Sequence, residues 1–365
     1  MSLPSGRSRA CLRAIAVLAA TAVCLLLAGC GSSGSTPQPP PPPVPLGHAY
    51  VTTSSNLFGF SITASNGGLT SISTPSGAPG GSAAVGNAQR DLLYTLTSDG
   101  HISGYSVNTS TGALTAISGS PWGGAGVGVA FLTMDTAGQY LFVPATQDFN
   151  VVPYTIGAGG ALTIGMEVGT PQGAAPLTAT VDPQAHFLYV PIGSTGIELY
   201  KITSGALTDM GTIPPLGATK PQFVAFTPSE TFAYISDGVT SVAGYSVNTT
   251  TGELTALSSG PFTAGPGPSA MAMTPNGKYL YVATSVALAQ FAVNSDGSLT
   301  SIGTPVAFTT PPVTMAIDPT GTYLYVLALN TGTVYIYKID STSGVLIAQP
   351  PGSVPGTATG IALTP

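Results

Sequence analysis

The sequence predicts an all-β protein, a seven-bladed β-propeller of four-stranded blades that is closed by a C-terminal strand completing the first blade. Three observations lead to this fold class. A strand-rich unit recurs about every 46 residues, and no segment has the 3.6-residue apolar period of a helix over ten or more residues. The two ends of the repeat region also match complementary parts of one unit. Residues 48–365 are therefore predicted to form one domain.

The repeat is marked by an aromatic residue inside a short apolar strand. An apolar strand precedes each copy, and a second aromatic strand, a glycine turn and a third strand that starts with leucine follow it. Four short strands per unit, separated by Gly, Pro, Asn and Asp turns, are typical of a propeller blade. The marker residues are Tyr50, Tyr94, Phe142, Tyr189, Tyr234, Tyr281 and Tyr325.

The first strand of each unit is expected to lie nearest the ring axis. One position in it is always small or β-branched, as convergence of seven strands requires: Val85, Thr133, Thr180, Ala225, Ala272, Ala316 and Ala362. The domain begins at His48 with the second strand of a blade, and residues 357–365 match a first strand. Pairing the two ends would close the ring and remove a sheet edge.

The N-terminal 29 residues are predicted to be a lipoprotein signal peptide. Arg7, Arg9 and Arg13 precede an uncharged apolar run at 14–27, which is shorter than the roughly 20 residues of a transmembrane helix. Leu27-Ala28-Gly29-Cys30 resembles the lipobox of bacterial lipoproteins, which implies acylation of Cys30 and a lipid bilayer as partner. The alternative is an ordinary secretory signal with an incidental cysteine.

Residues 30–47 are predicted to be a tether made of the lipidated cysteine and a Gly/Ser/Pro-rich linker. Its proline run at 37–45 favours an extended polyproline spacer of ~3.1 Å per residue. Gly31 follows the cysteine where lipoproteins retained in the inner membrane tend to carry Asp, which favours the outer membrane. The expected location is the bacterial cell envelope, with the membrane face left open.

Composition narrows the function classes. Only 6% of the residues are charged, and acidic residues outnumber basic ones by 14 to 8, which argues against nucleic-acid binding. Cys11 and Cys24 would leave with the signal peptide. No histidine pair has ligand spacing, and Asp135, Asp182 and Asp318 fit turn formers better than calcium ligands. No metal site and no cofactor are predicted.

Blades that read Tyr279-Leu-Tyr-Val282 and Tyr323-Leu-Tyr-Val326 resemble the YVTN and lactonase propeller group, which includes the 6-phosphogluconolactonase type. In that group a histidine often precedes the innermost strand, and Asn-Glu follows the Tyr-Val strand. Gln222 and Ser269 stand in the histidine positions of two blades here. Only Lys220 and Asp237 keep charge of the expected kind, so the resemblance implies them as catalytic candidates.

Further candidates lie on the loops that the blade topology brings to one rim. A ligand-binding rim is predicted from Asp99, His101, Trp122, Asp148 and Glu198. Trp122, the only tryptophan, is either an exposed stacking platform or, as we favour, a plug over a blade junction.

Two functions follow from these patterns. The first is a non-catalytic binding or assembly module on a membrane-anchored lipoprotein, with an envelope protein or glycan as partner. The alternative is a lactonase or related ring-opening hydrolase at the channel mouth, with Lys220 and Asp237 in the site. Fold alone does not decide between them.

Overall fold

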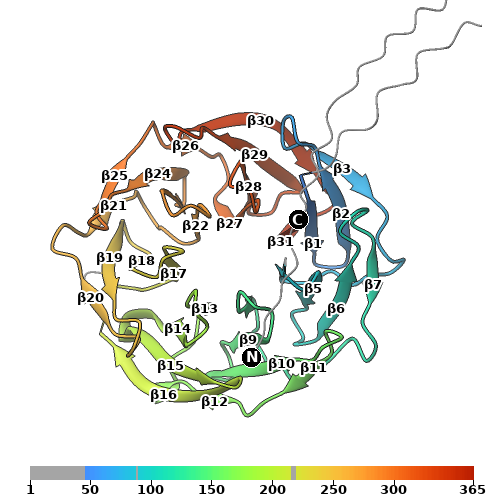
Figure 1. Ribbon diagram of the computed structural model, residues 1–365, viewed down its shortest axis with the longest axis horizontal. Coiled ribbons are helices and arrows are strands. Elements are labelled where there is room, and N and C mark those ends of the chain that lie inside the picture. The colour runs from blue at the N-terminus through green and yellow to red at the C-terminus, as the bar shows by residue number, and fades with distance from the viewer. Residues whose placement is uncertain (1–45, 88, 215–218) are drawn as a thin grey trace, which may run out of the picture. The chain divides into compact units, whose positions relative to one another are not determined.

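A computed structural model describes residues 46–365 except 88 and 215–218. The predicted signal peptide, Cys30 and the linker up to residue 45 lie outside the described residues. Within the described ranges, no helix is long and apolar enough to cross a membrane. Seven antiparallel sheets surround a central axis, as Figure 1 shows. The predicted seven-bladed propeller is confirmed.

Each blade has four main strands, ordered from the axis outward. The first blade contains β31 (Ala358–Thr364), β1 (His48–Thr53), β2 (Leu57–Ile62) and β3 (Leu69–Ile72). The second contains β4 (Ala83–Asn87), β5 (Leu92–Leu96), β6 (Ile102–Val107) and β7 (Leu114–Ala116). The third contains β8 (Thr133–Met134), β9 (Tyr140–Ala145), β10 (Asn150–Ile156) and β11 (Leu162–Ile164). The fourth contains β13 (Thr180–Val181), β14 (Phe187–Pro191), β15 (Ile197–Thr203) and β16 (Ala206–Ile213).

The remaining three blades repeat this order. The fifth contains β17 (Phe223–Phe226), β18 (Phe232–Ser236), β19 (Ser241–Val247) and β20 (Leu254–Ala256). The sixth contains β22 (Met271–Met273), β23 (Tyr279–Ala283), β24 (Ala287–Val293) and β25 (Leu299–Ser301). The seventh contains β27 (Pro312–Ile317), β28 (Tyr323–Ala328), β29 (Thr333–Ile339) and β30 (Leu346–Ser353). Short strands β12 (Val168–Gly169), β21 (Phe262–Thr263) and β26 (Val306–Ala307) extend three blades, and the 3-10 turns are η1 (Pro171–Gly173) and η2 (Gly193–Thr195).

The C-terminal strand closes the ring. β31 pairs antiparallel with β1 from His48↔Thr364 to Thr53↔Ala358, so both ends of the domain share one sheet. The closure predicted from residues 357–365 is confirmed. β31 also packs closely on the second blade. A Cβ atom added to Gly360 would lie only 2.9 Å from the Cα of Ala83. β31 therefore covers the inner edge of β1, which would otherwise be open.

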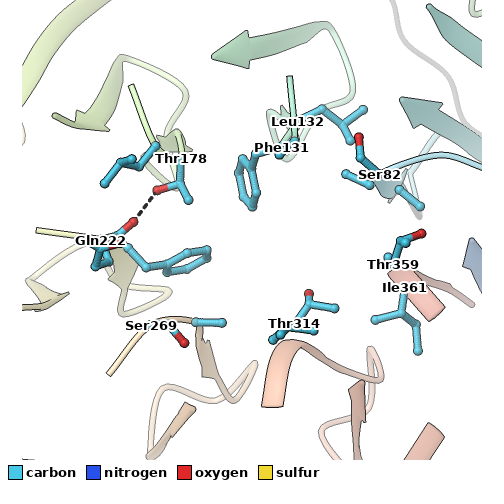
Figure 2. A pocket seen from close by; sticks show the side chains of 17 residues that line it. Ser82, Phe131, Leu132, Thr178, Gln222, Ser269, Thr314, Thr359 and Ile361 are labelled. Atoms are coloured by element: carbon cyan, nitrogen blue, oxygen red, sulfur yellow. Dashed lines mark hydrogen bonds between the residues drawn. The ribbon is translucent and has the colours of Figure 1, made fainter. Parts of the chain in front are cut away.

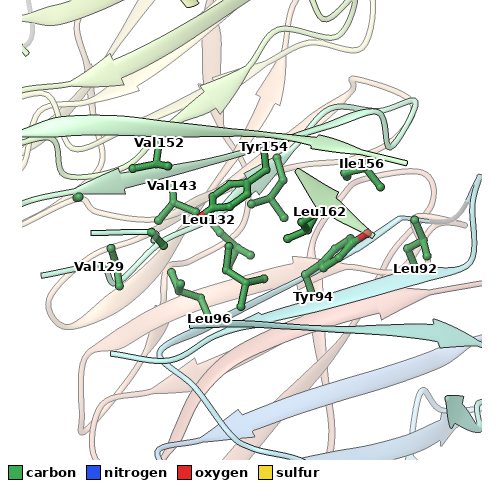
Figure 3. Packing of buried hydrophobic residues seen from close by; sticks show 14 of the residues in the cluster. Leu92, Tyr94, Leu96, Val129, Leu132, Val143, Val152, Tyr154, Ile156 and Leu162 are labelled. Carbon is green, nitrogen blue, oxygen red and sulfur yellow. The ribbon is translucent and has the colours of Figure 1, made fainter. Parts of the chain in front are cut away.

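Neighbouring blades pack face to face, which explains why their middle strands read as continuous apolar runs. Every residue of β5 and of β23 is buried. Figure 3 shows one interface, where Leu92, Tyr94 and Leu96 of the second blade meet Val143 and Tyr154 of the third. Burial on both faces removes the polar alternation of a half-exposed strand.

The repeat tyrosines also link each blade to the next. Their hydroxyl groups lie inside the blade interface and donate to a glycine carbonyl in the outer hairpin of the following blade. The bonds are Tyr50 to Gly112 (2.8 Å), Tyr94 to Gly160 (2.6 Å), Tyr189 to Gly252 (2.7 Å), Tyr234 to Gly297 (2.8 Å), Tyr281 to Gly344 (2.6 Å) and Tyr325 to Gly67 (2.9 Å). Phe142, the seventh marker residue, fills the same place without a hydroxyl group.

Candidate functional site

A cavity of about 370 Å³ lies on the ring axis, and every blade contributes to it. Each blade supplies two consecutive residues at or just before its innermost strand, which form two rings of seven. Figure 2 shows these side chains around the opening. The first ring is Ser82, Ala130, Leu177, Gln222, Ser269, Val313 and Thr359. The second ring is Ala83, Phe131, Thr178, Phe223, Ala270, Thr314 and Gly360.

The two rings present only uncharged groups. Phe131 and Phe223 meet edge to face, with their centroids 5.9 Å apart and an interplanar angle of 85°. Between their blades, the Thr178 hydroxyl donates to the Gln222 carbonyl over 2.7 Å, as Figure 2 shows. The Gln222 side-chain amide donates to the Lys220 carbonyl over 3.2 Å and leaves its own oxygen free to accept. The cavity therefore combines an aromatic wall with amide and hydroxyl groups, a lining suited to a neutral ligand.

The sequence located the axial strand face but not the cavity. The small residues expected near the axis, such as Val85 and Ala225, lie two positions beyond the second ring and therefore on the same strand face. Phe131, Thr178, Phe223 and Thr314 were not identified as site residues. A step of two positions back along each predicted inner strand would have found all of them.

Gln222 and Ser269 stand where the lactonase resemblance implies histidine. Both belong to the first ring and line the cavity. The side chains at these two positions are an amide and a hydroxyl group. Neither group is a general base at neutral pH.

Lys220 and Asp237 lie beside the cavity without lining it. The Lys220 side chain is exposed. Asp237 is only 5% exposed, and its Oδ1 accepts the backbone N–H groups of Val239, Thr240 and Ser241 over 2.8–2.9 Å. Its Oδ2 accepts the Ser241 hydroxyl over 2.6 Å.

These contacts fix the ionisation of Asp237. Burial opposes the charged form, but the hydrogen bonds from Ser241, Val239 and Thr240 outweigh it and hold the pKa of Asp237 below its usual value. Among the described residues, the one close contact between a basic and an acidic side chain joins His101 Nδ1 to Asp99 Oδ1 at 3.2 Å, so Lys220 and Asp237 do not pair. Asp237 therefore stabilises the hairpin between β18 and β19, in which it lies.

The predicted rim residues are spread over three blades, and none lines the cavity. Asp99 and His101 are exposed on one hairpin, where hydrogen bonds from Thr97 and His101 lower the pKa of Asp99. Asp148 accepts the Val127 N–H over 2.6 Å and so ties two loops of the rim together. Trp122 packs on the core between the second and third blades, with its ring 6.5 Å from that of Tyr94. The plug interpretation of Trp122 fits this packing.

The sequence analysis placed Glu198 in a rim loop, but this residue lies inside β15 and is only 1% exposed. Its Oε2 accepts the Thr212 hydroxyl over 2.6 Å, and its Oε1 has no partner in the described chain. Burial raises the pKa of Glu198 to about 7; the Thr212 bond opposes this shift, and the nearby Asp209 carboxyl adds to it. The sequence missed this because apolar alternation marks the strand but not which of its faces is covered.

The three inner-strand aspartates act as turn formers. One carboxylate oxygen of each accepts two backbone N–H groups of the following turn: Asp135 from Gln139 and Tyr140, Asp182 from His186 and Phe187, and Asp318 from Thr322 and Tyr323. In the part of the chain that the structure describes, no three His, Cys, Asp or Glu side chains gather in a group that could hold a metal ion.

Exposed apolar side chains gather on the cavity-bearing rim. The loops between blades and the hairpins between second and third strands lie on that rim, because every inner strand starts there. They carry five of the ten large apolar residues found exposed in the described chain, and a sixth, Val313, lies at the start of β27 on the same rim. We call these the rim apolar residues: Val127, Phe149, Val239, Val286, Val313 and Leu329.

Solved structures share this architecture at low sequence identity. A Bacteroides fragilis protein named as a candidate 6-phosphogluconolactonase matches with a TM-score of 0.75 and 18% identity, over 89% of this chain and 99% of its own. The periplasmic gluconolactonase of Pseudomonas aeruginosa matches with a TM-score of 0.72 and 17% identity, over 87% and 98%. A Lactobacillus plantarum protein matches with a TM-score of 0.73 and 21% identity, over 87% and 99%.

At these identities the structural matches show the fold alone. No curated protein sequence matches the chain. The model of one protein family, described as "Lactonase, 7-bladed beta-propeller", matches residues 46–353, which is nearly the whole ring. The chain therefore belongs to the family of lactonase seven-bladed β-propellers.

Proposed function

We propose that this protein is an exported, membrane-anchored lipoprotein whose propeller binds an envelope protein or glycan at the cavity-bearing rim without hydrolysing a lactone. One observation carries the proposal: the 17 side chains and glycines around the cavity include no acid, no base and no imidazole. Ring opening of a lactone needs a group that activates water and a positive or hydrogen-bonding site for the developing oxyanion. The cavity offers hydrogen bonds but no group to take the proton.

The rim apolar residues support binding of a macromolecule. Val239, Val286 and Leu329 stand 45–50% exposed at the hairpin tips of three consecutive blades. Exposed apolar side chains that cluster on one face mark interaction sites more often than scattered ones do. A partner that covers this rim would bury them and close the cavity.

The attachment point of the predicted tether also suits a binding role. The chain enters the ring at His48, which pairs with Thr364, whereas the cavity is lined by Thr359 and Gly360 at the other end of β31. A tether that joins the ring there leaves the cavity rim free. Cys30→Ser is expected to move the protein from the membrane fraction to the soluble fraction, which fractionation of cells would detect.

Binding is tested by capture from envelope fractions with two matched variants. Val286→Asp places a charge among the rim apolar residues, whereas Ile347→Asp places one on the outer strand β30, where Ile347 is similarly exposed. We expect the first variant to lose a captured protein or glycan by at least tenfold and the second to retain it. Equal retention by both variants would remove the rim from the proposal.

Family membership favours the alternative function, a lactone hydrolase with Lys220 and Asp237 in its site. Its test is turnover of uncharged and phosphorylated sugar lactones by the wild type, Lys220→Ala and Asp237→Asn. The binding proposal expects no turnover above the uncatalysed rate. Turnover that both substitutions abolish would establish the hydrolase instead.

A further inference from the structure

Two acidic residues lie buried against each other at the junction of the fourth and fifth blades, on the rim opposite the cavity. Asp182 directly follows β13, and Glu230 lies in the turn between β17 and β18. Both are 1% exposed. Three of their carboxyl oxygens are buried and accept no hydrogen bond from an N–H or O–H group of the described chain. They are Oε1 and Oε2 of Glu230 and Oδ2 of Asp182.

The blade repeat shows why these two side chains meet. The turn position of Glu230 is held by Gly138, Gly277 and Gly321 in three other blades, all with positive φ. A Cβ at these glycines would point at the turn of the preceding blade, at Asn87, Pro228 and Pro275 respectively. Glu230 has the same backbone conformation, with φ of +57°, and its side chain is therefore directed at the Asp182 turn.

The contact between the two groups requires a proton. An ionised carboxylate only accepts hydrogen bonds, and two buried carboxylates repel each other in a medium of low polarity. Glu230 nevertheless points at the Asp182 turn, and three carboxyl oxygens of the two residues are buried there without a donor. The Asp182 carboxyl group acts directly on that of Glu230. We propose that Asp182 and Glu230 share one proton across the blade junction, so that the fourth and fifth blades are held together by a carboxyl–carboxylate hydrogen bond that is lost at alkaline pH.

The two partners differ in the hydrogen-bond donors that surround them. Its Oδ1 accepts the N–H groups of His186 and Phe187 over 2.7 and 2.9 Å, which stabilises negative charge. Glu230 has no such donors, and burial together with the Asp182 carboxyl raises the pKa of Glu230 to about 8. The shared proton therefore resides on Glu230, which donates to Asp182 Oδ2.

Other titratable groups around the pair do not neutralise it. Tyr189 is buried beside both acids, and they help to raise its pKa further. His186, Lys201 and Lys278 on the adjoining turns and strands are exposed. None of the three forms an ion pair with Asp182 or Glu230 in the described chain.

The direction of the pH effect follows from the raised pKa of Glu230. In the unfolded chain Glu230 releases its proton near pH 4.5, whereas in the folded ring it keeps the proton to about pH 8. Between these values the folded state binds more protons than the unfolded state, so stability falls as the pH rises. The stabilising effect of the shared proton is complete below about pH 4.5 and is gone above about pH 8.

Melting temperatures of four proteins between pH 5 and 9 test the proposal. Glu230→Gln keeps the size of the side chain, and Glu230→Gly restores the residue of the other blades. Ala185→Gly is the matched control, because Ala185 occupies the same turn position one blade earlier with φ of +58°. It relieves the same backbone conformation and keeps both carboxyl side chains as well as the backbone N–H that residue 185 donates to the Asp182 carbonyl.

We expect the wild type and Ala185→Gly to lose melting temperature in parallel as the pH rises. Relative to both, Glu230→Gln and Glu230→Gly should gain about 3 °C or more between pH 5 and 9. Glu198 contributes equally to all four proteins, so the differences isolate the pair. Parallel curves for the Glu230→Gly and Ala185→Gly proteins would overturn the proposal.

Infrared spectroscopy gives a readout that a purely structural role would not move. The folded wild type at pH 6 should show the C=O stretch of a protonated carboxylic acid, and this band should disappear as the pH passes about 8. Because Glu198, whose pKa is raised to about 7, is also protonated at pH 6, the comparison uses proteins that carry Glu198→Gln. In these proteins the band is expected to be lost in Glu230→Gln and to disappear at lower pH in Asp182→Asn. A band that survives Glu230→Gln unchanged would show that the proton is not shared by this pair.

Discussion

At the scale of single residues, the repeat tyrosine does more than fill space with its ring, because its hydroxyl group forms a hydrogen bond to the next blade. Tyr281 is fully buried and donates to the Gly344 carbonyl of the next blade over 2.6 Å. Tyr281→Phe would leave that buried carbonyl without its donor and is expected to cost about 1–2 kcal/mol of unfolding free energy. Denaturant unfolding monitors this loss.

Tyr335 supplies the control for that substitution. It is partly buried against Phe308, and its hydroxyl group makes no hydrogen bond in the described chain. Tyr335→Phe should therefore change stability by less than about 0.5 kcal/mol. Equal losses in the two variants would mean that the tyrosine hydroxyl is not what joins the blades.

Glu198 is the second residue with a testable ionisation. Its folded pKa of about 7 lies above its usual value of 4.5, so its contribution to stability is complete below pH 4.5 and is lost as the pH rises through about 7. Glu198→Gln keeps an acceptor for the Thr212 hydroxyl and can donate to Asp209. The variant should melt higher than the wild type at pH 8 and differ little at pH 5; the opposite order would contradict a raised pKa.

At the scale of the element, the outer hairpins are built so that a glycine faces the preceding blade. Gly344 has φ of +74°, and a Cβ there would lie 2.3 Å from the Cδ1 of Tyr279. Gly344→Ala would strain the backbone and press on a buried ring, with an expected cost of about 2–4 kcal/mol. Calorimetric melting measures it directly.

The control for Gly344→Ala is a glycine in the corresponding hairpin of the third blade. Gly159 lies just before Gly160, and nothing stands within 4 Å of a Cβ added to it. Gly159→Ala should leave the melting temperature within about 2 °C of the wild type. A similar loss in both variants would point to hairpin flexibility instead of the contact with Tyr279.

A strand could be predicted from the sequence where residues close to one another in the chain determine it. The Tyr-Leu-Tyr-Val runs fix β23 and β28, because apolar and β-branched residues between glycine and proline turns have few other conformations. The cavity was less predictable, since Phe131 and Phe223 come from different blades and meet only after ring closure. Glu198 shows the same limit, because its burial depends on the neighbouring blade.

At the scale of the whole molecule, the ring depends on the last strand. Deletion of residues 357–365 removes β31, which pairs with six residues of β1 and packs on β4. The deletion should abolish cooperative melting and cause association, because it opens an innermost sheet edge and uncovers apolar surface. Size-exclusion chromatography and calorimetry follow both effects.

A deletion at the other end provides the contrast. The described residues begin at 46 and β1 begins at His48, so removal of residues 1–42 is expected to leave the melting temperature unchanged. If the 357–365 deletion melted like the wild type, closure by β31 would not be what stabilises the propeller.

The sequence by itself determined the class, the number of blades, the closing strand and the family of this protein, because these follow from a repeated local pattern of apolar residues and turns. The family resemblance also singled out the positions of Gln222 and Ser269, which line the cavity. Only the tertiary structure decided that seven inner strands enclose a neutral cavity, and that Asp182 meets Glu230 at a blade junction. The burial of a side chain and its contacts with other side chains depend on residues distant in the chain. Which of these residues come together is determined by how the blades pack.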